Sequence, residues 1–153
     1  MAFYIVQHGL SLPKDRDPEK GLAPEGIEDV RRIAEVSRNY GVKVERILHS
    51  GKKRALQTAE ILADVLKPEG GIKEIGGINP LDDVVEFAFQ VDFQANTMVV
   101  GHLPFLERLT SFLITGQKEP IVFKQQNGGI LCLDRIENQD TPCIMWAIMP
   151  LVS

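Results

Sequence analysis

The chain has 153 residues, the size of one ordinary domain, and 44% of them are hydrophobic, which is enough for a packed core. We therefore expect a single domain over residues 1–153. The formal net charge of −4 argues against a nucleic-acid-binding protein, because such proteins usually present a basic face. No apolar run reaches the roughly 18 residues of a membrane span, and the start of the chain lacks the basic segment of a secretory signal. We therefore expect a cytoplasmic protein with no membrane partner.

The expected secondary structure follows from the periodicity of the apolar residues and from proline and glycine at the ends of segments. In chain order, the expected elements are a strand at 3–6, a helix from Pro24 to Tyr40, a strand at 44–48, a helix from an N-cap at Ser50 to Leu66, a small strand at 72–75, a helix from Asp82-Asp83 to about Phe89, a strand at 97–101, a helix from Pro104 to Gly116, and antiparallel or edge strands at 130–133 and 144–148. Strands that alternate with helices predict a three-layer α/β/α sandwich with a mainly parallel sheet.

Polar residues follow three of the expected strands directly. The three histidines of the chain, His8, His49 and His102, all stand at such strand ends. Ligands of parallel sheets bind where loops leave the carboxyl ends of the strands. The sequence therefore predicts a functional site at this edge of the sheet, built around His8 and His102.

Two cysteines, Cys132 and Cys143, lie on separate apolar stretches without a Cys-x-x-Cys pattern or a neighbouring histidine. A zinc site needs a closer set of ligands, so we expect no metal site. We interpret the pair as buried thiols in a reducing compartment, although the sequence alone leaves a disulfide open.

Four motifs occur in an order and at a spacing that together resemble one known family. They are Gln7-His8-Gly9 after the first strand, Asp17 to Gly26 in the next loop, Ser50-Gly51-Lys52-Lys53-Arg54-Ala55-Leu56-Gln57-Thr58 at the second helix, and Gly101-His102-Leu103-Pro104 after the strand at 97–101. This pattern resembles the histidine phosphatase superfamily, whose fold is called phosphoglycerate-mutase-like, and within it the short, SixA-type phosphohistidine phosphatase branch.

The resemblance implies a phosphatase that needs no cofactor and no metal, with His8 as the nucleophile that accepts the phosphoryl group. A neutral imidazole can attack phosphorus and so divide hydrolysis into two steps. Arg54, at the start of its helix, and His102 are implied as phosphate ligands, since a guanidinium fork and a helix N-terminus both favour anions. Gly9 has no Cβ, which would let the backbone approach the phosphate.

Two positions depart from the family pattern. Gln7 stands where the family usually has arginine, and Lys20 replaces the loop arginine, so that the bidentate fork is lost. We predict that both still bind phosphate, but more weakly. Three functions follow: hydrolysis of phosphohistidine on a protein, hydrolysis of a small phosphorylated metabolite at the same site, or phosphate and phosphoprotein binding without catalysis. The short chain leaves little for a deep lid, which favours the protein substrate.

The proton donor is the least defined part of the expected site. Asp82 and Asp83 lie in the region where larger family members carry a glutamate acid, but both also suit a helix cap. His49 either lines the rim of the pocket or is a partly buried histidine at a strand end. Both pairs of alternatives stay open at this point.

Overall fold

The computed structural model describes residues 1–151 as one sheet with four helices. The elements are β1 (Phe3–Gln7), α1 (Pro24–Asn39), β2 (Arg46–His49), α2 (Lys53–Leu66), β3 (Ile72–Glu74), α3 (Val84–Ala88), β4 (Thr97–Gly101), α4 (Phe105–Thr115), β5 (Ile130–Asp134) and β6 (Cys143–Ile148). Within these residues, every expected element is present in the expected order.

The sheet has six strands in the order β3-β2-β4-β1-β5-β6. β1, β2, β3 and β4 pair in parallel, whereas β5 runs antiparallel to β1 and β6 antiparallel to β5. The mainly parallel sheet and the antiparallel terminal pair are both confirmed. The carboxyl ends of β1, β2 and β4 meet at one edge, because these three strands are parallel neighbours.

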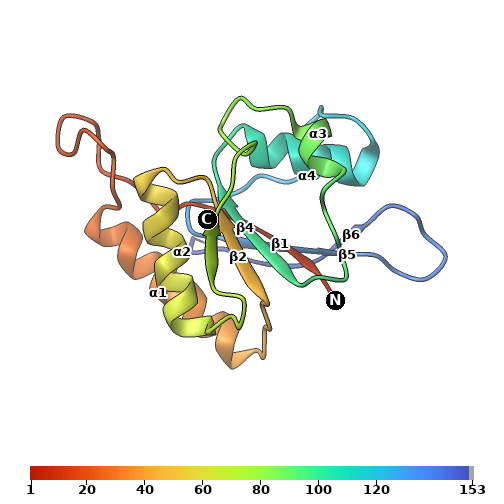
Figure 1. The fold of residues 1–153 in the computed structure, drawn as a ribbon, viewed down its shortest axis with the longest axis horizontal. Helices are drawn as coiled ribbons and strands as arrows, with labels where there is room; N and C mark the ends of the chain where they lie inside the picture. The colour runs from red at the N-terminus through yellow and green to blue at the C-terminus, as the bar shows by residue number, and fades with distance from the viewer. Residues whose placement is uncertain (152–153) are drawn as a thin grey trace.

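Helices cover both faces of the sheet, as Figure 1 shows, with α1 and α2 on one side and α3 and α4 on the other. The side chains of β1 alternate between the two layers. Tyr4 and Val6 pack under α1 and α2, whereas Phe3 and Ile5 pack under α3 and α4. This alternation buries all five residues of β1 and confirms the three-layer α/β/α sandwich.

The second strand and the second helix begin later than the sequence predicts. β2 starts at Arg46. Val44 is buried, but it lies in the loop before β2 and is not part of the strand. The expected N-cap at Ser50 is wrong, because α2 starts at Lys53 behind Lys52, and no side chain caps it. The Ser50 hydroxyl is instead hydrogen-bonded to His102.

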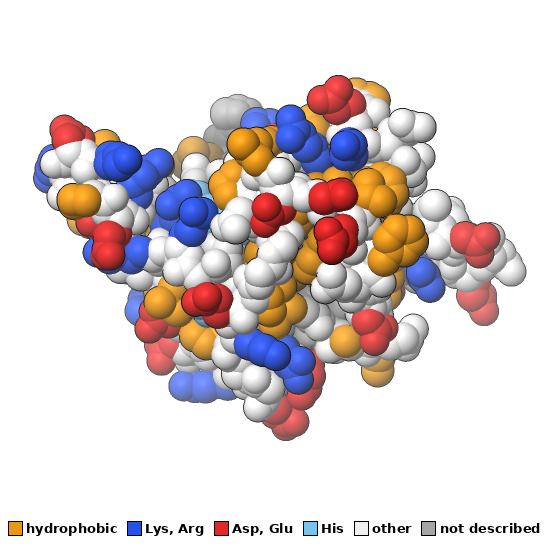
Figure 2. All heavy atoms as spheres, turned by 45° about the horizontal axis from the view of Figure 1, so that its top comes forward, with side chains coloured by type: hydrophobic (Ala, Val, Ile, Leu, Met, Phe, Trp, Pro, Cys, Tyr) orange, Lys and Arg blue, Asp and Glu red, His pale blue; other side chains and the backbone are white. Residues whose placement is uncertain are grey.

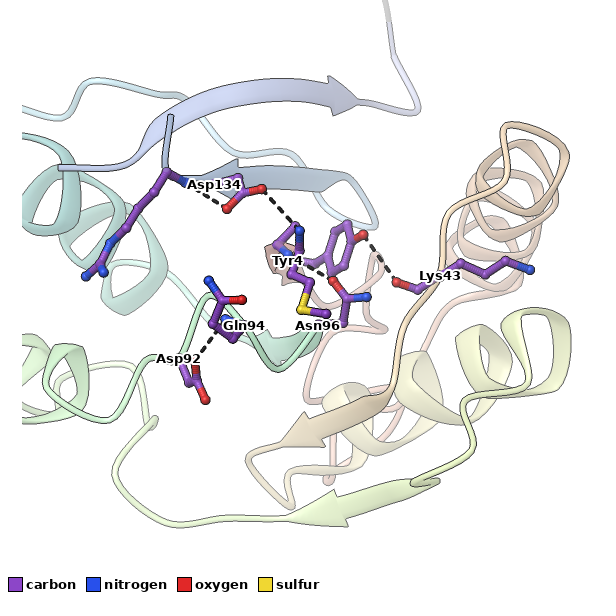
Figure 3. A network of polar contacts seen from close by, with 9 residues as sticks. Tyr4, Lys43, Asp92, Gln94, Asn96 and Asp134 are labelled. Atoms are coloured by element: carbon purple, nitrogen blue, oxygen red, sulfur yellow. Dashed lines mark hydrogen bonds and ion pairs between the residues drawn. The ribbon is translucent and has the colours of Figure 1, made fainter. Parts of the chain in front are cut away.

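Polar contacts tie the amino end of β1 to its neighbours (Figure 3). The Tyr4 hydroxyl donates to the carbonyl of Lys43 over 3.3 Å, and the Asn96 side chain accepts from the amide of Ala2 over 2.9 Å. The terminal amino group lies 3.5 Å from the carboxylate of Asp134. These contacts fix the end of the central strand that lies opposite the expected site.

Both cysteines are free thiols, Cys132 buried and Cys143 half-buried. Burial raises the pKa of the Cys132 thiol to about 11, so this thiol is protonated and unreactive at neutral pH. Across residues 1–151, no helix has both the length and the apolar character needed to cross a membrane.

Candidate active site

The first and fourth strands bring His8 and His102 together. Gln7 of β1 is paired with Gly101 of β4, and the amide of His8 donates to the carbonyl of Gly101 over 3.0 Å. The two imidazole rings therefore lie with their centres 5.1 Å apart. The two histidines therefore lie together at one edge of the sheet, as the sequence predicts.

The ring of His8 is held in one tautomer. Its Nδ1 lies 2.7 Å from the carbonyl oxygen of Gly9. A carbonyl can only accept, so in the neutral ring Nδ1 carries the proton and Nε2 has a free electron pair. No residue among 1–151 hydrogen-bonds this Nε2. The fixed ring therefore presents a nucleophilic nitrogen to a ligand.

Burial and positive neighbours keep His8 neutral. The pKa of His8 falls to about 4, first because of burial and then because of the charges of Arg54 and Lys20, against the opposing effect of the Gly9 carbonyl. At neutral pH the imidazole is therefore unprotonated, which is the form that can attack phosphorus.

His102 is almost completely enclosed, with 1% of its surface exposed. Its Nε2 lies 2.6 Å from the Ser50 hydroxyl, which comes from the loop after β2. Burial, followed by the charges of His8 and Arg54, lowers the pKa of His102 to about 3. A bound phosphate would oppose that shift, because a nearby negative charge favours the protonated ring.

A group of cations surrounds the two rings without matching carboxylates. Arg54 is half-buried in the first turn of α2, and burial lowers its pKa without removing its charge. Within residues 1–151, no carboxylate forms an ion pair with Arg54, Lys20 or Lys52. Figure 2 shows basic and acidic side chains mixed on the projecting loop at the left, with further basic side chains on the surface beside it. Unpaired positive charge beside a helix N-terminus is suited to an anion.

Gly9 holds the loop after β1 against helices α1 and α2. Its amide donates to the hydroxyl of Thr58 over 2.9 Å. A Cβ on Gly9 would lie 2.8 Å from a methyl group of Val30 and 3.2 Å from the carbonyl of Gly26. The need for glycine here thus comes from close packing within the protein, and contact of Gly9 with phosphate stays a prediction.

Gln7 is 9% exposed, and its Oε1 is buried without a hydrogen-bond partner among residues 1–151. The side chain lines a cavity of about 330 Å³ next to Leu10, Leu103 and Asn127. None of His8, Arg54 and His102 lines this cavity, and contact between the Gln7 amide and phosphate stays a prediction.

The three remaining candidates have structural partners. His49 is 4% exposed, and its Nδ1 accepts from the amide of Gly51 over 3.1 Å, which favours the buried strand-end interpretation over the pocket rim. Asp83 caps α3 by accepting from the amide of Val85 over 2.8 Å. Asp82 accepts from the amide of Asn79 over the same distance. Asp83 therefore stabilises the start of a helix and Asp82 stabilises a turn, and neither is a proton donor defined by this geometry.

Three contributors to the site were not predicted from sequence. Ser50 holds His102, Asn127 donates to the carbonyl of His8 over 3.0 Å, and the charge of Lys52 acts on His102. Ser50 and Lys52 lie within the motif that contains Arg54, so proximity to that motif was an available signal. Asn127 follows a stretch without a recognisable pattern, and its role depends on tertiary contact alone.

Comparison with known proteins shows which proteins this chain is similar to. No family model matches the chain. Phosphohistidine phosphatase SixA of Escherichia coli strain K12 is 28% identical over an alignment of 127 residues that covers 79% of this chain and 79% of that protein. A structure of the protein histidine phosphatase SixA complexed with tungstate has a TM-score of 0.80, at 23% identity, covering 98% of this chain and 97% of that one. The alpha-ribazole phosphatase of Shigella flexneri has a TM-score of 0.74, at 15% identity, covering 100% and 98%.

The sandwich, the paired histidines and these similarities agree with the resemblance of the chain to the histidine phosphatase superfamily. In sequence, the chain is similar to the phosphohistidine phosphatase SixA, and in fold it is similar to the SixA structure with the TM-score of 0.80. The expected fold is therefore confirmed, and the relatives named above are phosphatases.

Proposed function

We propose that this chain is a phosphatase that hydrolyses phosphohistidine on a protein, or a related phosphoramidate or phosphomonoester, through a phospho-His8 intermediate. The observation that carries the proposal is the free Nε2 of His8, held in a neutral ring beside cations that lack carboxylate partners. The similarity of this chain to SixA, a phosphohistidine phosphatase, supports the choice of substrate.

In the first step, the Nε2 electron pair of His8 forms a bond to phosphorus while the bond from phosphorus to the substrate imidazole breaks. Gly9 keeps the proton on Nδ1, so its carbonyl stabilises the positive charge that the phosphorylated ring acquires. Arg54, Lys20 and His102 are the proposed partners of the phosphoryl oxygens.

The leaving group explains why no dedicated acid is needed. When the second ring nitrogen of the substrate phosphohistidine is protonated, the ring departs as neutral imidazole and takes its electron pair with it. Asp82 and Asp83 can then remain in their turns. An alkoxide leaving group would instead need a proton donor.

In the second step, water attacks phosphorus, the bond from phosphorus to Nε2 breaks, and the electron pair returns to His8. Inorganic phosphate leaves, and the proton lost by the attacking water passes to solvent. His8 is then neutral again, as its pKa of about 4 favours. We also propose a cytoplasmic location, since the free thiols of Cys132 and Cys143 suit a reducing compartment.

A second candidate is a phosphatase for a small phosphorylated metabolite, which would use the same histidine. The likeness in fold to the alpha-ribazole phosphatase favours it, with a TM-score of 0.74. A phosphate-binding module without catalysis is the third outcome, motivated by Gln7 and Lys20 in place of arginine.

The deciding experiment incubates the chain with a carrier protein labelled at phosphohistidine. We expect loss of label from the carrier and transient label on His8, neither of which occurs with the control variant His8→Asn. Turnover of small phosphate esters without turnover of the carrier would favour the metabolite enzyme. Binding of phosphate with no turnover of either substrate would contradict the enzyme proposal.

A further inference from the structure

Between β1 and α1, a loop formed by residues 11–22 projects from the molecule (Figure 1, left). Ser11 and Leu22 form an isolated antiparallel bridge at its base, and the amide of Leu12 donates to the carbonyl of Gly21 over 2.8 Å. Lys20 stands just before the point where the loop returns to the body of the protein. The position of Lys20 therefore depends on how this returning segment is held.

Asp17 organises the returning segment on both sides of Lys20. One carboxylate oxygen accepts from the amide of Glu19 over 3.0 Å, and the other accepts from the amide of Gly21 over 2.9 Å. Lys20 between them has a φ of 53°, in the left-handed region that a side chain rarely adopts without support. The two bonds to Asp17 supply that support.

Lys53 fastens this arrangement to the start of α2. Its ammonium lies 2.8 Å from Asp17 and 3.7 Å from Glu19, so its charge is balanced by two carboxylates. The ion pair with Lys53 is the main cause that lowers the pKa of Asp17 to about 2. Lys53 immediately precedes Arg54, so the loop is attached beside the expected phosphate ligand.

Close packing leaves the attachment little freedom. A Cβ on Gly21 would lie 2.8 Å from Asp17 and 2.8 Å from the Lys53 side chain. One turn along α2, the side-chain oxygen of Gln57 accepts from the amide of Leu22 over 2.7 Å. The returning segment is thus bonded to α2 at two points, the Asp17–Lys53 pair and the hydrogen bond from Leu22 to Gln57.

We propose that Asp17 and Lys53 are positioning residues, a clamp that holds Lys20 toward the phosphate while Lys53 itself makes no contact with the phosphoryl group. The inference rests on the proposed phosphate site and assigns a role to two residues outside it. Lys20 follows directly on the segment that is bonded to α2 beside Arg54, and it forms no ion pair within residues 1–151. Its charge also lowers the pKa of both His8 and His102, as a minor cause after burial. Lys53, already balanced by carboxylates, acts only through the loop.

A double-mutant cycle with inorganic phosphate tests the clamp. Binding is measured by titration calorimetry for wild type, Lys20→Met, Lys53→Met and the double variant at constant ionic strength. We expect Lys53→Met to weaken binding about 5-fold when Lys20 is present and less than about 2-fold in the Lys20→Met background, because coupled residues are not additive. Lys53→Arg should recover most of the affinity, since it keeps the pair with Asp17.

Lys14→Met is the matched control, because it removes one positive charge from the same loop, where Lys14 is exposed and forms no ion pair within residues 1–151. Its affinity for phosphate should stay within about 1.5-fold of wild type if geometry rather than total charge matters. Additive effects of Lys20→Met and Lys53→Met, or an equal loss in Lys14→Met, would overturn the clamp.

The cycle also separates this inference from the proposed function. Phosphate binding with the expected coupling, but without turnover of any substrate, would support the clamp and contradict the phosphatase. Turnover accompanied by additive binding effects would support the phosphatase and contradict the clamp. If wild type binds no phosphate, there is no site for Lys20 to serve, and the clamp is wrong.

Discussion

The two ends of the sheet differ in whether their polar side chains have bonding partners. At the amino end, the Tyr4 hydroxyl, the Asn96 amide and the Asp134 carboxylate all have partners (Figure 3). At the carboxyl end, Gln7 Oε1 and His102 Nδ1 are buried without partners among residues 1–151. Buried polar atoms without partners cost stability, and among residues 1–151 the buried side-chain atoms of this kind lie at the carboxyl end.

The difference also separates what each end contributes. The amino end holds the central strands in register, and its contacts should affect folding stability but not phosphate binding. The carboxyl end holds unbalanced charge and neutral imidazoles, and its residues should affect binding and turnover more than folding. Substitutions at each end test this division.

The largest effect is expected from His8→Ala, which removes the proposed nucleophile. Turnover of a phosphohistidine carrier should fall by at least about 10³-fold, because no other group can form the intermediate. The free energy of unfolding should change by no more than about 1 kcal/mol, as judged from urea denaturation. Residual activity near the wild-type level would exclude phospho-His8.

Arg54→Ala should cost about 3 kcal/mol of transition-state stabilisation, or roughly 10²-fold in kcat/KM, through loss of one preorganised donor. Arg54→Lys should recover only part of this, because lysine lacks the planar fork. Steady-state kinetics of the two variants under matched conditions provide the measurement. Full recovery by lysine would mean that charge alone, without bidentate geometry, serves the site.

Acid should destabilise the unliganded protein through the two site histidines. In the unfolded chain a histidine binds a proton near pH 6.5, whereas folded His8 and His102 do so only near pH 4 and pH 3. Their contribution is therefore complete above pH 6.5 and is lost as the pH falls below it. His8 alone should account for about 1–2 kcal/mol between pH 7 and pH 5.

Urea denaturation of wild type and His8→Asn at pH 7 and pH 5 measures this contribution. The variant should lose less stability over that interval than wild type does. Equal losses in the two proteins would show that His8 titrates in the folded chain as it does in the unfolded chain, and that its environment does not keep it neutral.

Gln7→Arg restores the charge that the family pattern carries beside His8. If the cavity next to Gln7 accepts the longer side chain, free phosphate should inhibit several-fold more strongly at matched ionic strength. The rate need not rise, because tighter binding of the ground state does not lower the barrier. An unchanged inhibition constant in a folded variant would mean that Gln7 faces away from the phosphate.

The smallest effect is expected at the amino end. Tyr4→Phe removes the hydroxyl that donates to Lys43, which should cost about 0.5–1.5 kcal/mol of unfolding free energy. The phosphate inhibition constant should not change, because Tyr4 lies at the opposite end of β1. A change in that constant would break the division between the two ends of the sheet.

The amino-acid pattern alone determined the fold class and the order of the elements, and its motifs carried the family resemblance. Alternation of apolar strands with amphipathic helices is set by neighbours close in sequence, so β1, β4 and α4 could be predicted. The positions of His8 and His102 followed from the same logic, because parallel strands end at one edge. Their roles toward phosphate were implied by resemblance and stay predictions.

Only the tertiary structure decided which partner each polar side chain has. Ser50 looked like a helix cap because local propensity favours serine there, but a contact 52 residues away, with His102, takes its hydroxyl. Gly9 has no room for a side chain because Val30 and Gly26 of α1 lie against it. Asn127 donates a hydrogen bond to His8, which is 119 residues away in the sequence. Such contacts depend on strand register and on how helices pack across the sheet, and neither is encoded in the local spacing of residues.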